Sequence, residues 1–262
     1  MAVATANPAL NTDAYTEARR SQAMQRLQGG RALVSSDNVM TLNGTVGKCF
    51  VLLALVCAGA CWTWQMFWTS GNPAVVTPWM VGGLIGGLVV ALITTFKRTL
   101  APFTAPLYAM LQGLALGGLS AVFQARYPGI VLQAVGLSLG TCAAMLLVYA
   151  SRLIRPTHKF MIGVAAAAGG LMLFYLATMV LGFFHIQVPF LFAGGPIGIA
   201  FSVFVVIIAA LNLIIDFGVI ESGVDMQAPK YMEWYSAFGL MVTLVWLYVE
   251  FLRLLAKVRR SD

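Results

Sequence analysis

The chain has 262 residues, of which 60% are hydrophobic and only 10% are charged. Its apolar runs are long enough to cross a hydrocarbon core of about 30 Å, which excludes a soluble globular domain and predicts an all-α, polytopic membrane protein. The formal net charge of +7 comes from basic residues near predicted helix ends, so we expect the lipid bilayer and its anionic headgroups as partners, and no nucleic acid.

The first 45 residues are polar and precede the first apolar run. We expect them to form a partly disordered cytoplasmic arm, with a short helix from about Asp13 to Leu27 that Gly29 and Gly30 would end. The segment lacks the pattern of a signal peptide. Basic residues in this arm and in later connections predict a cytoplasmic N-terminus by the positive-inside rule, and they are Arg19, Arg20, Arg26, Arg31, Lys48, Lys97, Arg98, Arg152, Arg155 and Lys159.

Seven apolar runs follow, each close to the roughly 20 residues that one helical crossing needs. No polar stretch among them is long enough for a second domain, so residues 46–262 are predicted to form one seven-helix membrane domain. The predicted spans are 49–67, 76–96, 104–124, 129–150, 160–184, 196–217 and 231–256.

The basic C-terminal tail conflicts with seven crossings. Starting from a cytoplasmic N-terminus, seven spans place Arg253, Lys257, Arg259 and Arg260 outside, where the positive-inside rule disfavours them. Either the number of crossings is even or the tail is an exception. A re-entrant segment at 190–198, interrupted by glycine and proline, is one way to reach an even count.

Small residues recur at helical spacing in spans two to five. Such spacing lets helix backbones approach closely, so we expect a tightly packed bundle. The glycines concerned are Gly82, Gly83, Gly86, Gly87, Gly113, Gly117, Gly118, Gly136, Gly140, Gly169 and Gly170.

Ser138 lies in a pentapeptide, 136–140, whose letters match the nucleophile pattern G-x-S-x-G. That pattern acts at a strand-to-helix elbow beside a base, whereas here it falls mid-helix, and the histidines His158 and His185 stand in a loop and at a span end. We therefore predict helix packing here, no catalytic residue and no enzyme activity. The cysteines fall inside apolar spans without a ligand cluster, which predicts no disulfide, no tightly bound metal and no cofactor; they are Cys49, Cys57, Cys61 and Cys142.

Acidic residues are absent from residues 38–215 and reappear only in the last quarter of the chain. Glu221 and Asp225 fall in the polar connection that is predicted between spans six and seven, where we expect them to be solvated. They are therefore weak candidates for a functional site.

Asp216 follows the apolar run 205–215, and Asn212 precedes it by one helical turn on the same face. A membrane-buried acid is costly and usually faces a bundle interior or a water path, so both residues are candidates for an ion pathway. The alternative is an interfacial acid at the frayed end of span six.

Glu233 and Glu250 on the last span are the candidate partners of Asp216. In a simple helical hairpin centred near residues 224–225, Glu233 lies level with Asp216. Glu250 comes 17 residues later, roughly 25 Å further along the helix. Arg253, three residues beyond Glu250, and a lysine seven residues beyond it offer that carboxylate a local ion pair.

A carboxylate pair of this kind has a defined chemistry. Two carboxylates within a few ångströms share a proton, because like charges in a poor dielectric cannot both ionise, and such a pair is a pH switch. The pair also attracts Ca²⁺, but a tight site needs about six to eight oxygens, so any Ca²⁺ contact at Asp216 is expected to be weak.

Six stretches of the chain carry distinctive motifs, which are Asn7-Pro-Ala-Leu10, Met40-Thr-Leu-Asn-Gly-Thr45, Tyr108-Ala-Met-Leu-Gln-Gly113, Leu116-Gly-Gly-Leu-Ser-Ala121, Leu211-Asn-Leu-Ile-Ile-Asp-Phe217 and Ala228-Pro-Lys-Tyr-Met-Glu-Trp-Tyr235. Together they resemble a bacterial branch of the Bax inhibitor-1 family, and the resemblance covers nearly the whole chain. It implies a seven-helix fold in which six helices surround the seventh, with a proton-sensitive carboxylate pair that closes a calcium leak. Asp216 matches the family's acid on helix six.

The second acid and two other positions depart from the family pattern. The stretch 247–251 resembles the family stretch that carries the second acid, which is Glu250 in this chain. Glu250 lies further along the chain from Asp216 than is usual in the family, whereas Glu233 lies closer than is usual. Gln112 stands where many relatives have a glutamate, and Gly218 where this branch often has a second aspartate. Both changes remove ionisable groups.

The sequence therefore supports three functional hypotheses. The first is a pH-responsive cation leak of the bacterial inner membrane, with Ca²⁺ or H⁺ as the transported or gating ion and Asp216, Asn212, Glu233 and Glu250 as candidate residues. The second is a non-conducting regulator that binds a membrane protease or another membrane protein through its arm, which deletion of residues 1–40 would abolish. The third, an intramembrane hydrolase, predicts loss of activity in Ser138→Ala.

Overall fold

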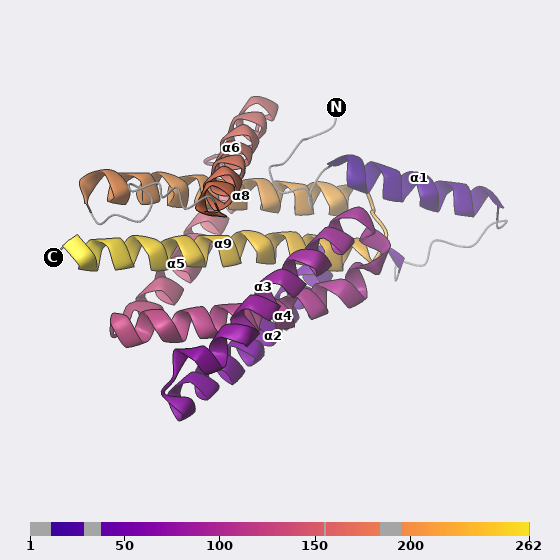
Figure 1. Cartoon of the computed structure of the whole chain (residues 1–262). Helices are drawn as coiled ribbons and strands as arrows, with labels where there is room; N and C mark the ends of the chain where they lie inside the picture. The colour runs from indigo at the N-terminus through magenta and orange to yellow at the C-terminus, as the bar shows by residue number, and fades with distance from the viewer. Residues whose placement is uncertain (1–11, 29–37, 155, 184–194, 262) are drawn as a thin grey trace. The chain divides into compact units, whose positions relative to one another are not determined.

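The structure, a computed structural model, describes residues 12–28, 38–154, 156–183 and 195–261, and these are helical apart from turns and one isolated β-bridge between Val39 and Pro229. Figure 1 labels the helices along the chain. They are α1 (Thr12–Gln28), α2 (Leu42–Ser70), α3 (Pro73–Phe96), the short 3₁₀ helix η3 (Arg98–Leu100), α4 (Ala101–Arg126), α5 (Ile130–Ala150), α6 (His158–Phe183), α8 (Pro196–Asp225) and α9 (Met232–Ser261).

Seven helices in the described part of the chain are long and apolar enough to cross a membrane, which confirms the predicted all-α, polytopic membrane protein. They are α2, α3, α4 with η3, α5, α6, α8 and α9, and each overlaps one predicted span. The predicted helix in the arm is also present, as α1.

The first spanning helix begins earlier than its apolar run. The Thr41 side chain caps α2 by accepting a hydrogen bond from the Gly44 amide at 3.0 Å. The helix therefore starts at Leu42, within the stretch predicted as the arm, and it ends where Gly71 adopts a left-handed conformation with φ of 63°.

Helix α8 runs further than predicted. It continues through Asp216 and ends only at Asp225, because the stretch after residue 217 is still helical. Asp216 is therefore well inside a helix, so the predicted alternative of a frayed helix end at this residue is wrong. Glu221 and Asp225 lie on the last turns of α8 and not in a connection, and Asp225 alone of the two is exposed.

The described part divides into two compact units. The first contains α1, α2, α3 and most of α4, together with the end of α8 and the start of α9. The second contains α5, α6, the start of α8 and the end of α9. Both α8 and α9 thus contribute to each unit.

In the first unit α2, α3 and α4 pack alongside one another (Figure 1) through glycines. A Cβ added to Gly59 of α2 would lie 2.7 Å from the Met110 carbonyl oxygen of α4, and one added to Gly113 would lie 3.0 Å from the Val56 carbonyl carbon. Such distances leave no room for a side chain. The predicted close approach is confirmed for Gly83, Gly113, Gly117 and Gly118, but it is wrong for Gly82, where an added Cβ would meet no described atom within 4 Å.

The glycines of the second unit behave differently. A Cβ added to Gly136, Gly140, Gly169 or Gly170 would meet no atom of the described chain within 4 Å, so the prediction that these glycines pack helices together is wrong for the described residues. The unit is held instead by a cluster of buried Ala168, Leu171, Val205 and Ile208, against which Ala167, Phe201 and Trp246 pack.

The three helices with the most burial are α4, α8 and α9. In their most apolar stretches 44%, 50% and 44% of residues are buried, against 17–22% for the other four spanning helices. Residues 190–194 of the segment predicted as re-entrant lie outside the described residues. Helix α8 begins at Pro196.

Candidate functional site

Asp216 and Asn212 lie one turn apart on α8 and are both buried, with exposed fractions of 0% and 3%. The Asn212 amide nitrogen Nδ2 donates a hydrogen bond to Thr243 Oγ1 of α9 at 3.2 Å. Within the described residues, Asn212 Oδ1 has no hydrogen-bond partner. A buried acid in an apolar helix, next to a buried amide, is a candidate for a functional site because such burial is costly.

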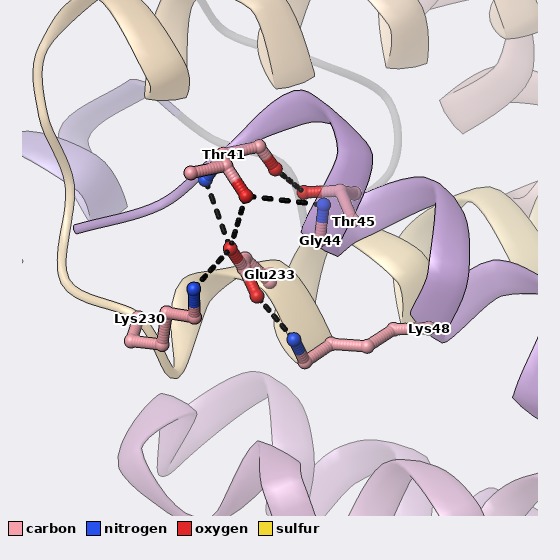
Figure 2. Close-up of polar contacts among 6 residues, drawn as sticks. All are labelled: Thr41, Gly44, Thr45, Lys48, Lys230 and Glu233. Carbon is pink, nitrogen blue, oxygen red and sulfur yellow. Dashed lines mark hydrogen bonds and ion pairs between the residues drawn. The ribbon is translucent and has the colours of Figure 1, made fainter. Parts of the chain in front are cut away.

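Glu233 lies in the first turn of α9 with its carboxylate fully buried. Its Oε1 accepts hydrogen bonds from the Thr41 backbone amide and from the Thr41 hydroxyl, both at 2.9 Å. Lys48 of α2 forms an ion pair with Oε2, and Lys230 lies 3.4 Å from Oε1. Figure 2 shows these donors surrounding the carboxylate. The arrangement is a structural anchor, because each oxygen is already engaged by a cation or a hydrogen-bond donor.

Gly44 makes room for this carboxylate. A Cβ at this position would lie 2.6 Å from Glu233 Cδ, which is shorter than any normal contact. Helix α2 has no acidic residue in its own first turn, so Glu233 supplies from another helix the negative charge that a helix N-terminus favours.

The backbone before α2 holds the start of α9 in place. The Met40 amide donates to the Ala228 carbonyl at 2.7 Å, and the Lys230 amide donates to the Asn38 carbonyl at 3.1 Å. These two bonds flank the β-bridge between Val39 and Pro229. The pairing brings Thr41 to Glu233 although 192 positions separate them in the chain.

Glu250 lies near the other end of α9 and is 1% exposed. The Tyr175 hydroxyl of α6 donates to its Oε1 at 3.1 Å, and Arg253 pairs with the same oxygen at 3.0 Å. The predicted local ion pair with Arg253 is therefore present. Its other oxygen, Oε2, has no hydrogen-bond partner in the described part of the chain.

Lys257, which was predicted as a second cation for Glu250, makes its hydrogen bonds elsewhere. Its ammonium donates to the Gly198 carbonyl oxygen at 3.1 Å and to the Ser202 hydroxyl at 2.8 Å, both in the first turns of α8. Sequence reasoning missed this site, as it missed Thr41, Gly44, Lys48 and Lys230 around Glu233. One signal was available for Lys257, because it stands seven residues after Glu250 and fourteen after Thr243 on a single helical stripe.

The remaining candidates contribute no cluster. The Ser138 hydroxyl donates to the Ala134 carbonyl within α5 at 2.7 Å. His158 begins α6, and His185 lies outside the described residues. In the described ranges, no three His, Cys, Asp or Glu side chains are placed to hold a metal ion.

Comparison with known proteins identifies a family for this chain. A family described as Bax inhibitor 1 like matches residues 7–260, nearly the whole chain. No curated protein and no solved structure matches this chain. With its seven apolar helices, the chain belongs to the Bax inhibitor 1 like family of multi-pass membrane proteins.

Proposed function

We propose that this protein is a pH-responsive cation leak of the bacterial inner membrane, with Asp216 as its proton-binding group. The observation that carries the proposal is the complete burial of Asp216 within an apolar spanning helix, one turn from the buried Asn212. An ionised carboxylate is costly there unless water or a cation reaches it. Protonation therefore shifts the balance between a closed state and a conducting one, provided that the two states bind the proton differently.

The register of α8 and α9 indicates how the other acids relate to Asp216. Asn212 contacts Thr243, and Gly198, 14 residues earlier, contacts Lys257, 14 residues later, so the helices are antiparallel in one register. Continued by one turn, this register places Asp216 level with Gly239. Glu233 is then six residues away along α9, about 9 Å, and Glu250 eleven residues away, about 16 Å.

Glu233 is thus the nearer of the two glutamates, and we propose that it is the second carboxylate of the switch. Its ion pairs with Lys48 and Lys230 hold it at the start of α9. Approach of Glu233 to Asp216 requires release from this anchor, which makes the anchor part of the closed state. Ca²⁺ or H⁺ passes as a transient occupant, because two carboxylates supply too few oxygens for tight Ca²⁺ binding.

Contacts between distant helix ends support a start of α2 and an end of α9 on opposite sides of the membrane. If each apolar helix crosses once, six crossings separate the starts of α2 and α9, and four separate the α4–α5 connection from the end of α9. An even number of crossings returns the chain to the same side of the membrane, and two helix ends must lie on the same side to contact each other directly. The contacts are Thr41 with Glu233 at one end, and Lys257 with Gly198 and Arg259 with Pro128 at the other.

The experiment is calcium and proton flux in liposomes that contain the purified protein, measured from pH 5 to 8. We expect flux that changes with pH, and Asp216→Asn, a permanently neutral mimic of the protonated acid, should behave at every pH like wild type at low pH. Asp225→Asn makes the same change at an exposed position of the same helix and should leave the profile unchanged. Whichever of Glu233→Gln and Glu250→Gln alters the profile is the partner. Flux no greater than that of empty liposomes at every pH would contradict the proposal.

A regulator that binds a membrane protease or another membrane protein is the second candidate. It is favoured by the docking of α1, in which Glu17 lies 3.4 Å from Arg98 and Ala18 is 6% exposed. Deletion of residues 1–35 removes this helix but keeps the pairing around Val39. A regulator would lose its partner in a pull-down of membrane proteins, whereas a leak would keep its pH-dependent flux.

A further inference from the structure

We propose that Lys257 is a tethered cation which occupies a monovalent-cation site at the start of α8. Its ligands are two neutral oxygens, the Gly198 carbonyl at 3.1 Å and the Ser202 hydroxyl at 2.8 Å. The ammonium also lies 6.0 Å from the centre of the Phe201 ring. The side chain is 9% exposed and Ser202 is 2% exposed, so this is a built interior site and not a surface contact.

The position of this lysine is unfavourable on simple electrostatic grounds. The N-terminus of a helix carries partial positive charge and attracts anions, yet here a buried ammonium lies in the first turns of α8. Among the described residues, no carboxylate oxygen lies within 4.0 Å of it. The stabilisation comes from the oxygens that replace its hydration shell and from the more distant negative charge of Glu250 on the same helix.

The ligand set indicates which ions fit. Carbonyl and hydroxyl oxygens without a carboxylate replace the hydration of a monovalent cation, as in channels that are lined by backbone carbonyls. Ca²⁺ takes about six to eight oxygens and prefers carboxylates among them, which this site lacks. The site therefore fits an ammonium-type or alkali-metal ion.

Lys257 also ends a polar stripe on α9. Thr243, Glu250 and Lys257 recur every seven residues, nearly two helical turns, and all three are buried. Each contacts a polar group of α8 or α6: Asn212, Tyr175 and Ser202, respectively. A cation that enters this stripe from the end of α9 meets the fixed charge of Lys257 first. The lysine thus acts as a plug at that end.

The first test measures binding without any flux. Lys257→Ala removes the ammonium and leaves space for a small ion. We expect methylammonium to raise the melting temperature of this variant in detergent by at least about 2 °C, and tetramethylammonium, which has the same charge but no N–H donor, to have no effect at equal ionic strength. Wild type and the double variant Lys257→Ala/Ser202→Ala should not respond to either ion. Equal responses to the two ions, or a response in the double variant, would overturn the site.

The second test measures the plug, and it rests on the proposed leak. Lys257→Met, which keeps an apolar stem, should increase potassium flux in liposomes several-fold, and Lys257→Arg should not. Arg259→Met is the matched control, because Arg259 is a neighbouring tail cation that binds Pro128 and Gln133 instead. Unchanged flux in a folded Lys257→Met overturns the plug. Selective methylammonium binding in a protein that never conducts would keep the site and reject the leak.

Discussion

The two units of this protein differ in how completely their small and polar residues are used. In the first, glycines of α2 and α4 lie against backbone, and the Glu233 carboxylate is engaged by Thr41 and two lysines. In the second, a Cβ added to Gly136 or Gly140 would meet no described atom within 4 Å, and Glu250 keeps one oxygen without a partner in the described part of the chain. At these positions the first unit engages its small and polar residues in contacts within the described chain, whereas the second unit leaves them without such contacts.

The strongest test of this comparison is Glu233→Gln. The change leaves the Lys48 ammonium, whose side chain is only 18% exposed, without its counter-charge, and we expect a loss of about 3 kcal/mol in unfolding free energy. Thermal unfolding in detergent measures it. Glu17→Gln is the control, because its side chain is 76% exposed and its pair with Arg98 should contribute almost nothing. A melting temperature for Glu233→Gln equal to that of wild type would show that the anchor is not structural.

Glycine substitutions compare the packing of the two units directly. Gly113→Ala places a Cβ 3.0 Å from the Val56 carbonyl carbon, and backbone cannot move aside, so we expect a loss of about 2 kcal/mol. Gly140→Ala places its Cβ in open space and should be neutral or slightly stabilising in the monomer, since alanine favours a helix by up to about 1 kcal/mol. The unfolding temperatures of the two variants, each compared with wild type, test this difference in packing. A large loss in Gly140→Ala would indicate a packing partner outside the chain.

Gly44→Ala tests the anchor without changing any charge. The added Cβ would lie 2.6 Å from Glu233 Cδ and push the carboxylate away from Thr41, which should cost about 1–2 kcal/mol because the side chain can shift where backbone cannot. Gly47→Ala, one turn along the same helix, meets no atom within 4 Å and is the matched control. The difference in melting temperature between the two variants gives the steric effect alone. Equal values would contradict the need for glycine at position 44.

The fold was largely predictable from the apolar runs, and the errors lie at helix ends. Runs of apolar residues predicted all seven spans. The start of α2, however, is set by the Thr41 cap and not by hydropathy. Helix α8 continues through polar residues to Asp225, so the connection to α9 lies later than the hairpin centre estimated near residues 224–225. With the connection in this later position, Glu233 is no longer level with Asp216, although the sequence predicted that it would be.

The candidate site was only partly predictable, for a physical reason. Asp216 and Asn212 stand out in sequence because polar groups in an apolar helix are costly, and that cost is visible without a structure. The contact between Thr41 and Glu233 depends on packing across 192 positions, and no local pattern encodes it. The Lys257 site lies between these cases, since its heptad spacing from Thr243 is visible but its ligands on α8 are not.

The smallest loss of stability that we expect from a buried residue is that of Glu250→Gln. Glutamine keeps an acceptor for the Tyr175 hydroxyl and removes an ion pair with Arg253, whose side chain is 46% exposed, so the loss in unfolding free energy should be about 1 kcal/mol. Glu233→Gln should therefore lower the melting temperature about three times as much, although both changes replace a buried glutamate of the same helix. Parallel unfolding curves of the two variants give the ratio. A larger loss at Glu250 would mean that its second oxygen also holds a group, and that the second unit is as fully engaged as the first.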